Sequence, residues 1–217
     1  MTTVASEDDE VQVETRRPVS GHKRRSDLST ARLLQAAAHL IAEKGYGRTS
    51  LIEIANASGY SHGLVTLRFG SKEGLLRALF DRMTADWTIR EIHPAIVGRV
   101  GMEVIRALLD VTRQAIRRNP TNVRALYALM FEAVLGVEVL EERVRAFHES
   151  QRVMYHRILA EGIDAGVVRA DTNIDEAASL IISLIRGAGY QWLLEPDYDL
   201  DHALAVIENT LDRLFRA

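Results

Sequence analysis

The sequence predicts an all-α fold of about nine helices, with a short N-terminal head followed by a longer helical body. Three observations support this fold class. Apolar residues recur at helical spacing along most of the 217-residue chain. Serines stand where helices should begin, and glycines or prolines stand where they should end. No alternating strand pattern of useful length and no internal repeat interrupts the helical pattern.

Residues 27–87 are predicted to contain a three-helix helix-turn-helix head and a fourth helix after it. The first begins at Ser29 or Thr30 and ends at Gly45. Its apolar stripe consists of Leu33, Leu34, Ala37, Leu40 and Ile41. The other three helices are predicted to follow one another closely, each with a serine at its start. Those serines are Ser50, with Glu53 as its capping-box partner, Ser61 and Ser71.

The body is predicted to contain five longer helices. They cover residues 97–118, 122–135, 139–164, 174–195 and 200–215. We therefore divide the chain into three parts. These are a disordered arm over 1–26, a head over 27–87 and a body over 88–217.

Charge is unevenly distributed. Residues 1–15 carry five acids and no base, residues 16–80 carry a net charge of +7, and residues 81–217 carry −5. A basic head in an acidic chain favours binding to a polyanion, although a solvated charged face would give the same count. The chain has no cysteine and no apolar run long enough to cross a membrane.

Residues 50–69, SLIEIANASGYSHGLVTLRF, predict a helix-turn-helix. Ile54 and Ala55 of the first helix should pack on Val65 of the second. Gly59 should take the left-handed conformation that a tight turn requires. Ser61 then leaves the N-terminus of the second helix able to face DNA.

Residues 29–80 resemble the DNA-binding head of the tetracycline-repressor (TetR) family. The matching segments are AxxLIAEKGYGRTSL, IANASGYSHG and FGSKEGLL. The resemblance implies a cytoplasmic homodimer that binds a palindromic operator in double-stranded DNA and responds to a small molecule. It also implies a set of DNA contacts, which are Ser50, Ser61, His62, Gly63, Leu64, Thr66, Arg68 and Lys72.

Within that set, Ser50 and Lys72 are expected to contact phosphate, and residues 61–64 are expected to read bases. Thr66, Leu67 and Ile52 depart from the residues that are common in the family. We therefore hypothesise that Arg68 carries more of the contact, because a bidentate arginine prefers guanine.

The last two helices are expected to form the dimer surface, since the final helix repeats leucine and isoleucine at heptad spacing. The expected interface residues are Ile181, Leu184, Ala188, Leu204, Ile207, Leu211 and Leu214. Packing of the same seam within one protomer is the alternative.

Methionine and aromatic residues of the body suggest a cavity for an apolar or aromatic ligand, although such residues also form ordinary cores. The expected lining is Trp87, Met102, Arg106, Tyr127, Met130, Phe131, Phe147, His148, Gln151, Tyr155 and Trp192. The resemblance implies that the ligand shifts the body to a conformation that moves the fourth helix and separates the recognition helices.

The sequence thus predicts a repressor that a small molecule releases from DNA. An activator on the same fold and a helical interaction module without DNA binding remain open. No enzyme is expected, because nucleotide, hydrolase and metalloprotease motifs are missing and the seven histidines are scattered. No cofactor or metal is expected either.

Overall fold

The computed structural model describes residues 21–195 and 197–217 and has an all-α fold, as predicted. The head contains α1 (Gly21–Lys44), α2 (Leu51–Ser58), α3 (His62–Phe69) and α4 (Lys72–Asp86). A π-helical segment, η1 (Trp87–Ile92), and α5 (His93–Ile96) continue α4 without a break. The body continues with α6 (Met102–Arg118), α7 (Pro120–Val134), α8 (Glu138–Asp164), α9 (Ile174–Leu194) and α10 (Leu200–Phe215). If α4, η1 and α5 are counted as one rod, the described residues form nine helical rods, as the sequence predicted.

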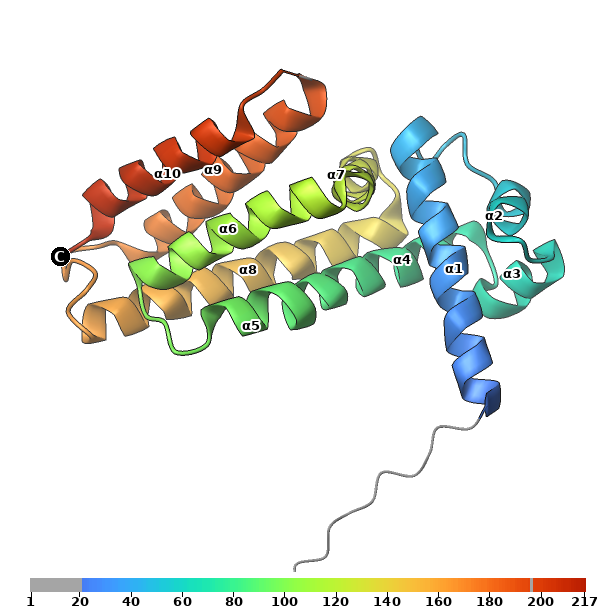
Figure 1. Cartoon of the computed structure of the whole chain (residues 1–217), viewed down its shortest axis with the longest axis horizontal. Coiled ribbons are helices and arrows are strands. Elements are labelled where there is room, and N and C mark those ends of the chain that lie inside the picture. Colours follow the sequence, from blue (N-terminus) through green and yellow to red (C-terminus); the bar gives the residue numbers. More distant parts are fainter. Residues whose placement is uncertain (1–20, 196) are drawn as a thin grey trace, which may run out of the picture.

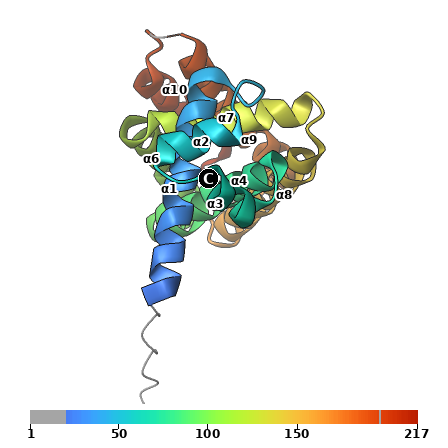
Figure 2. The ribbon, with the colours of Figure 1, turned by 90° about the vertical axis from the view of Figure 1, so that its right-hand side faces the viewer.

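The head lies at one end of an elongated molecule (Figure 1). α2 and α3 project beyond α1, while the rod of α4 and α5 runs back beneath the body. α9 and α10 lie side by side on the opposite side of the body from this rod. Seen from the head end, α1 stands in front of the body helices (Figure 2). The head is therefore joined to the body by a continuous helix as well as by packing.

Two helix starts differ from the sequence prediction. α1 begins at Gly21, so residues 21–26 of the expected arm are helical, and the rest of that arm lies outside the described residues. Ser29 and Thr30 are inside α1 and not at its start, and both hydroxyls donate to the Ser26 carbonyl oxygen, at 2.8 and 3.0 Å. α6 begins at Met102 and not at residue 97, because Gly101 holds a positive φ of 54° just before it.

The apolar residues form two separate cores. The body core joins η1 to α6, α8, α9 and α10. The head core contains the inner faces of α1–α4 and also side chains of α7 and the first turns of α8. Those added side chains are Ala125, Leu129, Ala133, Leu140 and Val144. In its packing, α7 thus belongs to the head, although the sequence division at residue 87 assigned it to the body.

The expected dimer seam is wrong for most of its residues. Ile181, Ala188, Leu204, Ile207 and Leu211 are buried in the body core of a single protomer. The heptad spacing of α10 therefore reflects packing within one chain. Of the two remaining residues of the expected seam, Leu184 is partly buried against the same core and Leu214 is 46% exposed.

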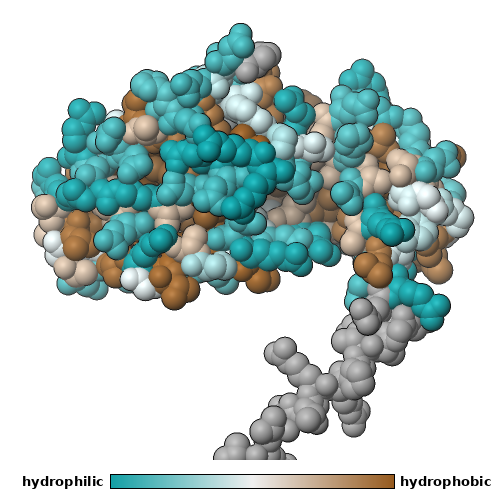
Figure 3. Space-filling view, viewed as in Figure 1, coloured by the Kyte–Doolittle hydropathy of each residue, from teal (hydrophilic) through white to brown (hydrophobic). Residues whose placement is uncertain are grey.

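The face of the body in Figure 3 is largely hydrophilic over its middle, with hydrophobic residues scattered among the polar ones. Within the described ranges, no helix combines the length and apolar character needed to cross a membrane. The same residues contain no group of three or more histidine and acidic side chains placed to hold a metal ion.

Candidate functional site

The turn between α2 and α3 has the geometry that the sequence predicted. The Ser50 hydroxyl accepts from the Glu53 backbone N–H at 3.3 Å, and the Glu53 carboxylate accepts from the Ser50 N–H at 2.9 Å, so the capping box is complete. Gly59 is left-handed, with φ of 75° and ψ of 22°. Ile54 and Val65 are both buried. Local capping thus fixes where α3 begins relative to α2.

The outer face of α3 presents the candidate DNA-reading residues. His62, Gly63, Thr66 and Leu67 are exposed, and Leu67 is 83% exposed. A β-carbon added to Gly63 would meet only the Ser61 hydroxyl oxygen, at 4.0 Å. The protein itself therefore leaves this position open, and a surface that lies against α3 could approach its backbone closely.

Arg68 lies on the other side of α3. Its guanidinium donates to the Ser26 carbonyl and hydroxyl oxygens, to the Thr30 hydroxyl at 3.0 Å and to the Ser29 hydroxyl at 3.2 Å. These partners all lie on α1. In this conformation Arg68 ties α3 to α1 and is not free to read a base, which corrects the hypothesis drawn from the sequence. The sequence signal that could have indicated these partners is the group of three hydroxyl residues, Ser26, Ser29 and Thr30, on one turn of α1.

The start of α4 carries the expected phosphate-binding lysine. The Lys72 ammonium lies 4.0 Å from the centre of the Tyr46 ring, which is a cation–π contact. Burial lowers the pKa of Lys72, and burial together with Glu73 raises the pKa of Tyr46. Lys72 is therefore held in place beside Tyr46 while its charge stays close to the surface.

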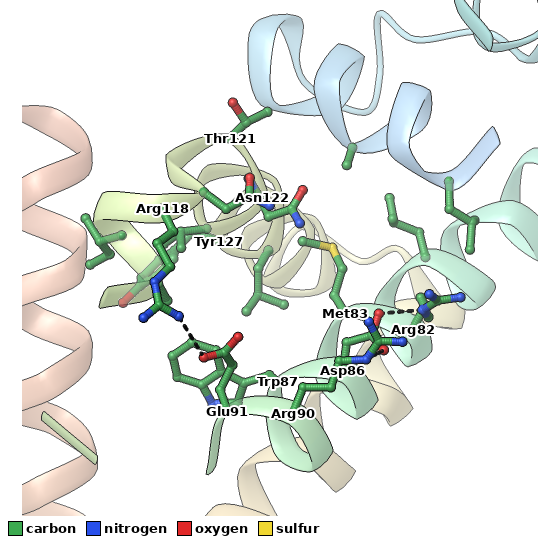
Figure 4. Close-up of a pocket in the computed structure, with 18 of the residues that line it drawn as sticks. Arg82, Met83, Asp86, Trp87, Arg90, Glu91, Arg118, Thr121, Asn122 and Tyr127 are labelled. Atoms are coloured by element: carbon green, nitrogen blue, oxygen red, sulfur yellow. Dashed lines mark hydrogen bonds and ion pairs between the residues drawn. The ribbon is translucent and has the colours of Figure 1, made fainter. Parts of the chain in front are cut away.

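A large cavity lies between the head core and the body core. Its volume is about 1000 Å³, and α1, α4, η1, α6, α7, α8 and α9 all contribute to its wall. Figure 4 shows the side where α4 and η1 face α7. Apolar side chains make up much of the wall. They are Leu79, Met83, Trp87, Ile116, Leu126, Met130, Phe147 and Met154.

The acidic residues of the cavity wall are paired with arginines. Asp86 contacts Arg82 at 2.5 Å and Arg90 at 3.1 Å, and Glu91 lies 3.7 Å from Arg118 (Figure 4). Each carboxylate therefore already has a cation beside it, which reduces its attraction for a positively charged ligand.

A polar group lies on the α8–α9 side of the cavity. The Arg186 guanidinium donates to the Gln151 side-chain oxygen and lies 6.0 Å from the centre of the Phe147 ring. The Tyr127 hydroxyl donates to the Arg186 carbonyl oxygen at 3.2 Å, and burial raises the pKa of Tyr127 to about 12. The cavity thus holds a cationic group among aromatic side chains.

Six of the eleven expected pocket residues line this cavity. They are Trp87, Tyr127, Met130, Phe147, Gln151 and Tyr155. The other five do not line it. Met102 is packed in the body core, and Arg106 is paired with Glu208 and Asp212. Phe131 is 46% exposed, whereas Trp192 lies under the Arg124 guanidinium.

The fifth, His148, sits next to the cavity without lining it. Its Nε2 atom is buried and has no hydrogen-bond partner among the described residues. Burial first, and then the charges of Arg186 and Arg152, lower its pKa to about 4. His148 is therefore neutral at physiological pH.

The sequence prediction missed the charged rim of the cavity. Asp86, Arg90 and Glu91 face the cavity together with Met83 and Trp87, from which they are separated by the ordinary spacing of one helix face. Helical spacing alone could not have grouped these residues with Arg118 of α6.

Two family models match this chain. Residues 33–79 match the bacterial regulatory proteins of the tetR family, and residues 101–216 match the BetI-type transcriptional repressor C-terminal model. A helix-turn-helix transcriptional repressor of Mycobacterium tuberculosis is 30% identical over 198 residues, which covers 84% of this chain and 99% of the relative.

Solved structures agree with this match. A TetR transcriptional regulator from Chloroflexus aurantiacus has a TM-score of 0.79 at 26% identity and covers 89% of this chain and 98% of its own. A regulator structure from Saccharomonospora viridis, solved in complex with choline, has a TM-score of 0.78 at 20% identity and covers 88% and 99%. The second likeness concerns the fold alone.

Proposed function

Because this chain belongs to the TetR family of bacterial transcriptional regulators, we propose that it is a homodimeric repressor that a small molecule releases from its operator. The observation that carries the proposal is the exposed outer face of α3, which the capped α2–turn–α3 unit holds in place. Such a helix can enter the major groove with its first residues against base edges. A protein that regulates genes in this way acts in the bacterial cytoplasm.

The proposed base-reading face consists of His62, Gly63, Thr66 and Leu67. Leu67 replaces Arg68 in this role, because it points outward while Arg68 is bonded to α1. An exposed leucine on the recognition helix favours contact with a thymine methyl group. Leu64, which is partly buried, supports the same face from one side.

Ser50, Ser61 and Lys72 are proposed to contact the DNA backbone. Both serines are exposed N-caps, so a phosphate beside either would lie at the positive end of a helix dipole. Lys72 adds a full positive charge at the start of α4. These contacts would position the head on DNA without selecting a sequence.

The proposed dimer surface is the exposed side of α9 and α10, not the buried seam. Its larger apolar side chains are 38–62% exposed in the single chain. They are Leu180, Tyr190 and Leu194 on α9, and Val206 and Leu214 on α10. Burial of such a stripe against a second copy would give a four-helix interface.

The cavity is proposed to bind the effector. Its wall includes residues of α1 and α4 from the head and residues of α6 and α8 from the body. A molecule that fills it would contact both cores at once. It could therefore favour one relative placement of head and body over another, which is the requirement for a ligand-driven shift between states.

A gel-shift titration with the chromosomal region upstream of the gene tests the proposal. We expect salt-sensitive, sequence-specific binding by a dimer. Leu67→Ser should lower specific affinity about tenfold, since the loss of one matched base pair in a site typically costs about 1–3 kcal/mol. Leu180→Ser, also a partly exposed leucine but on α9, should leave the base-reading face unchanged and instead weaken the dimer in analytical ultracentrifugation. Absence of specific binding at low salt would contradict the proposal.

A further inference from the structure

Among the described residues, Arg186 is a cation of the large cavity that lacks an acidic partner. Within residues 21–195 and 197–217, no carboxylate oxygen forms an ion pair with its guanidinium. Its side-chain contacts are the neutral Gln151 amide oxygen and the face of Phe147. Burial lowers the pKa of Arg186, which means that its charge is held there at some cost.

The charges near Arg186 reinforce this imbalance. The charge of Arg152, which is also positive and which pairs with Glu149 on the protein surface, lowers the pKa of Arg186 further. The low pKa of the neighbouring His148, caused by burial and then by these two arginines, reports the same positive surroundings. An anion placed beside Arg186 would therefore be attracted, and a cation would be repelled.

Further hydrogen-bond donors can supplement the guanidinium. Tyr155 is buried, lines the cavity and has no hydrogen bond from its hydroxyl within the part of the chain that is described. The Gln151 amide accepts from Arg186 through its oxygen, so its NH₂ group can donate to a ligand. A carboxylate has two acceptor oxygens and matches such a planar arrangement of donors.

The rest of the cavity is suited to an apolar group. Met83, Trp87, Ile116, Met130 and Met154 line it, and its volume of about 1000 Å³ exceeds what a small anion would occupy. The carboxylates on the opposite side are neutralised by their own arginines. The cavity therefore combines a long apolar wall with the Arg186 guanidinium, which forms no ion pair among the described residues.

We propose that the effector is an amphipathic organic acid, whose carboxylate binds Arg186 with help from Gln151 and Tyr155 and whose apolar body lies against Trp87 and the methionines. This inference rests on the proposed function, since it names the chemical class of the effector for the same cavity. It narrows the sequence-based expectation of an apolar or aromatic ligand.

Isothermal titration calorimetry with three ten-carbon probes, without DNA and at pH 7.5, tests the inference. The probes are decanoate, decanol and decyltrimethylammonium, which differ in head-group charge. We expect decanoate to bind at least tenfold more tightly than decanol and the cationic probe to bind least tightly. Arg186→Met should bring decanoate to the affinity of decanol, while decanol changes less than threefold.

Two further variants separate the charge of Arg186 from its shape and from general effects. Arg186→Lys keeps the charge but loses the planar donor pair, so part of the decanoate preference should remain. Arg124→Met removes one positive charge from an exposed site outside the cavity and should keep the full preference. If circular dichroism shows that Arg186→Met does not fold, the decanoate preference of Arg186→Lys, compared with that of the wild type, decides whether Arg186 binds the carboxylate.

The inference is overturned if decanol or decyltrimethylammonium binds the wild-type protein more tightly than decanoate. It is also overturned if Arg186→Met keeps the preference, or if no straight-chain carboxylate of six to fourteen carbons binds below 1 mM. Specific DNA binding in the gel shift, combined with any of these results, would refute only the ligand class. A carboxylate preference without specific DNA binding would refute only the proposed repressor function.

Discussion

Replacing Arg68 by methionine should destabilise the head and not change which DNA sequence it prefers. The guanidinium joins α3 to Ser26, Ser29 and Thr30 of α1 through four hydrogen bonds. A typical hydrogen bond contributes about 0.5–1.5 kcal/mol, and more when one partner is charged. Because the side chain is partly exposed, and the three hydroxyl groups keep other partners or water, we expect a total loss of about 2 kcal/mol.

Urea denaturation followed by circular dichroism measures this loss. Arg77→Met is the matched control, since Arg77 is an exposed arginine of α4 without a hydrogen bond or ion pair among the described residues. It should change the unfolding free energy by less than about 0.5 kcal/mol. If Arg68→Met instead keeps full stability and loses discrimination against base changes in a gel shift, Arg68 reads bases and the structural assignment is wrong.

Three other outcomes follow from the geometry. Gly63→Ala should raise the thermal stability of the free protein, because the position is open and alanine favours the helix over glycine by about 0.5–1 kcal/mol. The same variant should weaken specific DNA binding. An unchanged gel-shift affinity would show that DNA does not approach this backbone closely. Gly189→Ala should lower the unfolding free energy in urea denaturation by about 1–3 kcal/mol, because the new β-carbon would lie 2.1 Å from the Tyr127 hydroxyl oxygen. A variant as stable as wild type would mean that the Tyr127 side chain moves freely. The unfolding free energy should fall as the pH drops from about 6.5 towards 4, because His148 takes up a proton in the unfolded chain but resists protonation in the folded chain. In pH-dependent melts, His148→Leu should remove about 1–2 kcal/mol of that fall. An identical pH slope in the variant would contradict the lowered pKa of His148.

The head could be predicted closely because its signals are local. Ser50 and Glu53 form their capping box within one turn, and Gly59 sets its own backbone angle. Arg68 could not be assigned in this way, because its partners lie about forty residues earlier on another helix. Sequence spacing places a side chain on a face of a helix, but it does not reveal what packs against that face.

The body shows the same limit at larger scale. The heptad spacing of α10 identified Leu204 and Leu211 as contact residues but could not distinguish a second copy of the chain from α9 of the same chain. Only the fold reveals that Arg186 faces the cavity and that no acidic partner pairs with it among the described residues. Charge pairing is a property of three-dimensional neighbours, so composition cannot supply it.

The π-helical segment η1 has an evolutionary consequence. The His93 N–H donates to the carbonyl oxygen of Thr88, five residues earlier, so this turn holds one residue more than an α-helical turn. In a lineage of related proteins, such a turn is equivalent to a single-residue insertion that a helix has absorbed without a loop. Loss of one codon here would restore an ordinary helix and change which side chains of residues 87–92 face the cavity, while α4 and α5 keep their own packing. Ligand preference could therefore diverge through one insertion or deletion while both cores and the DNA-reading surface stay intact.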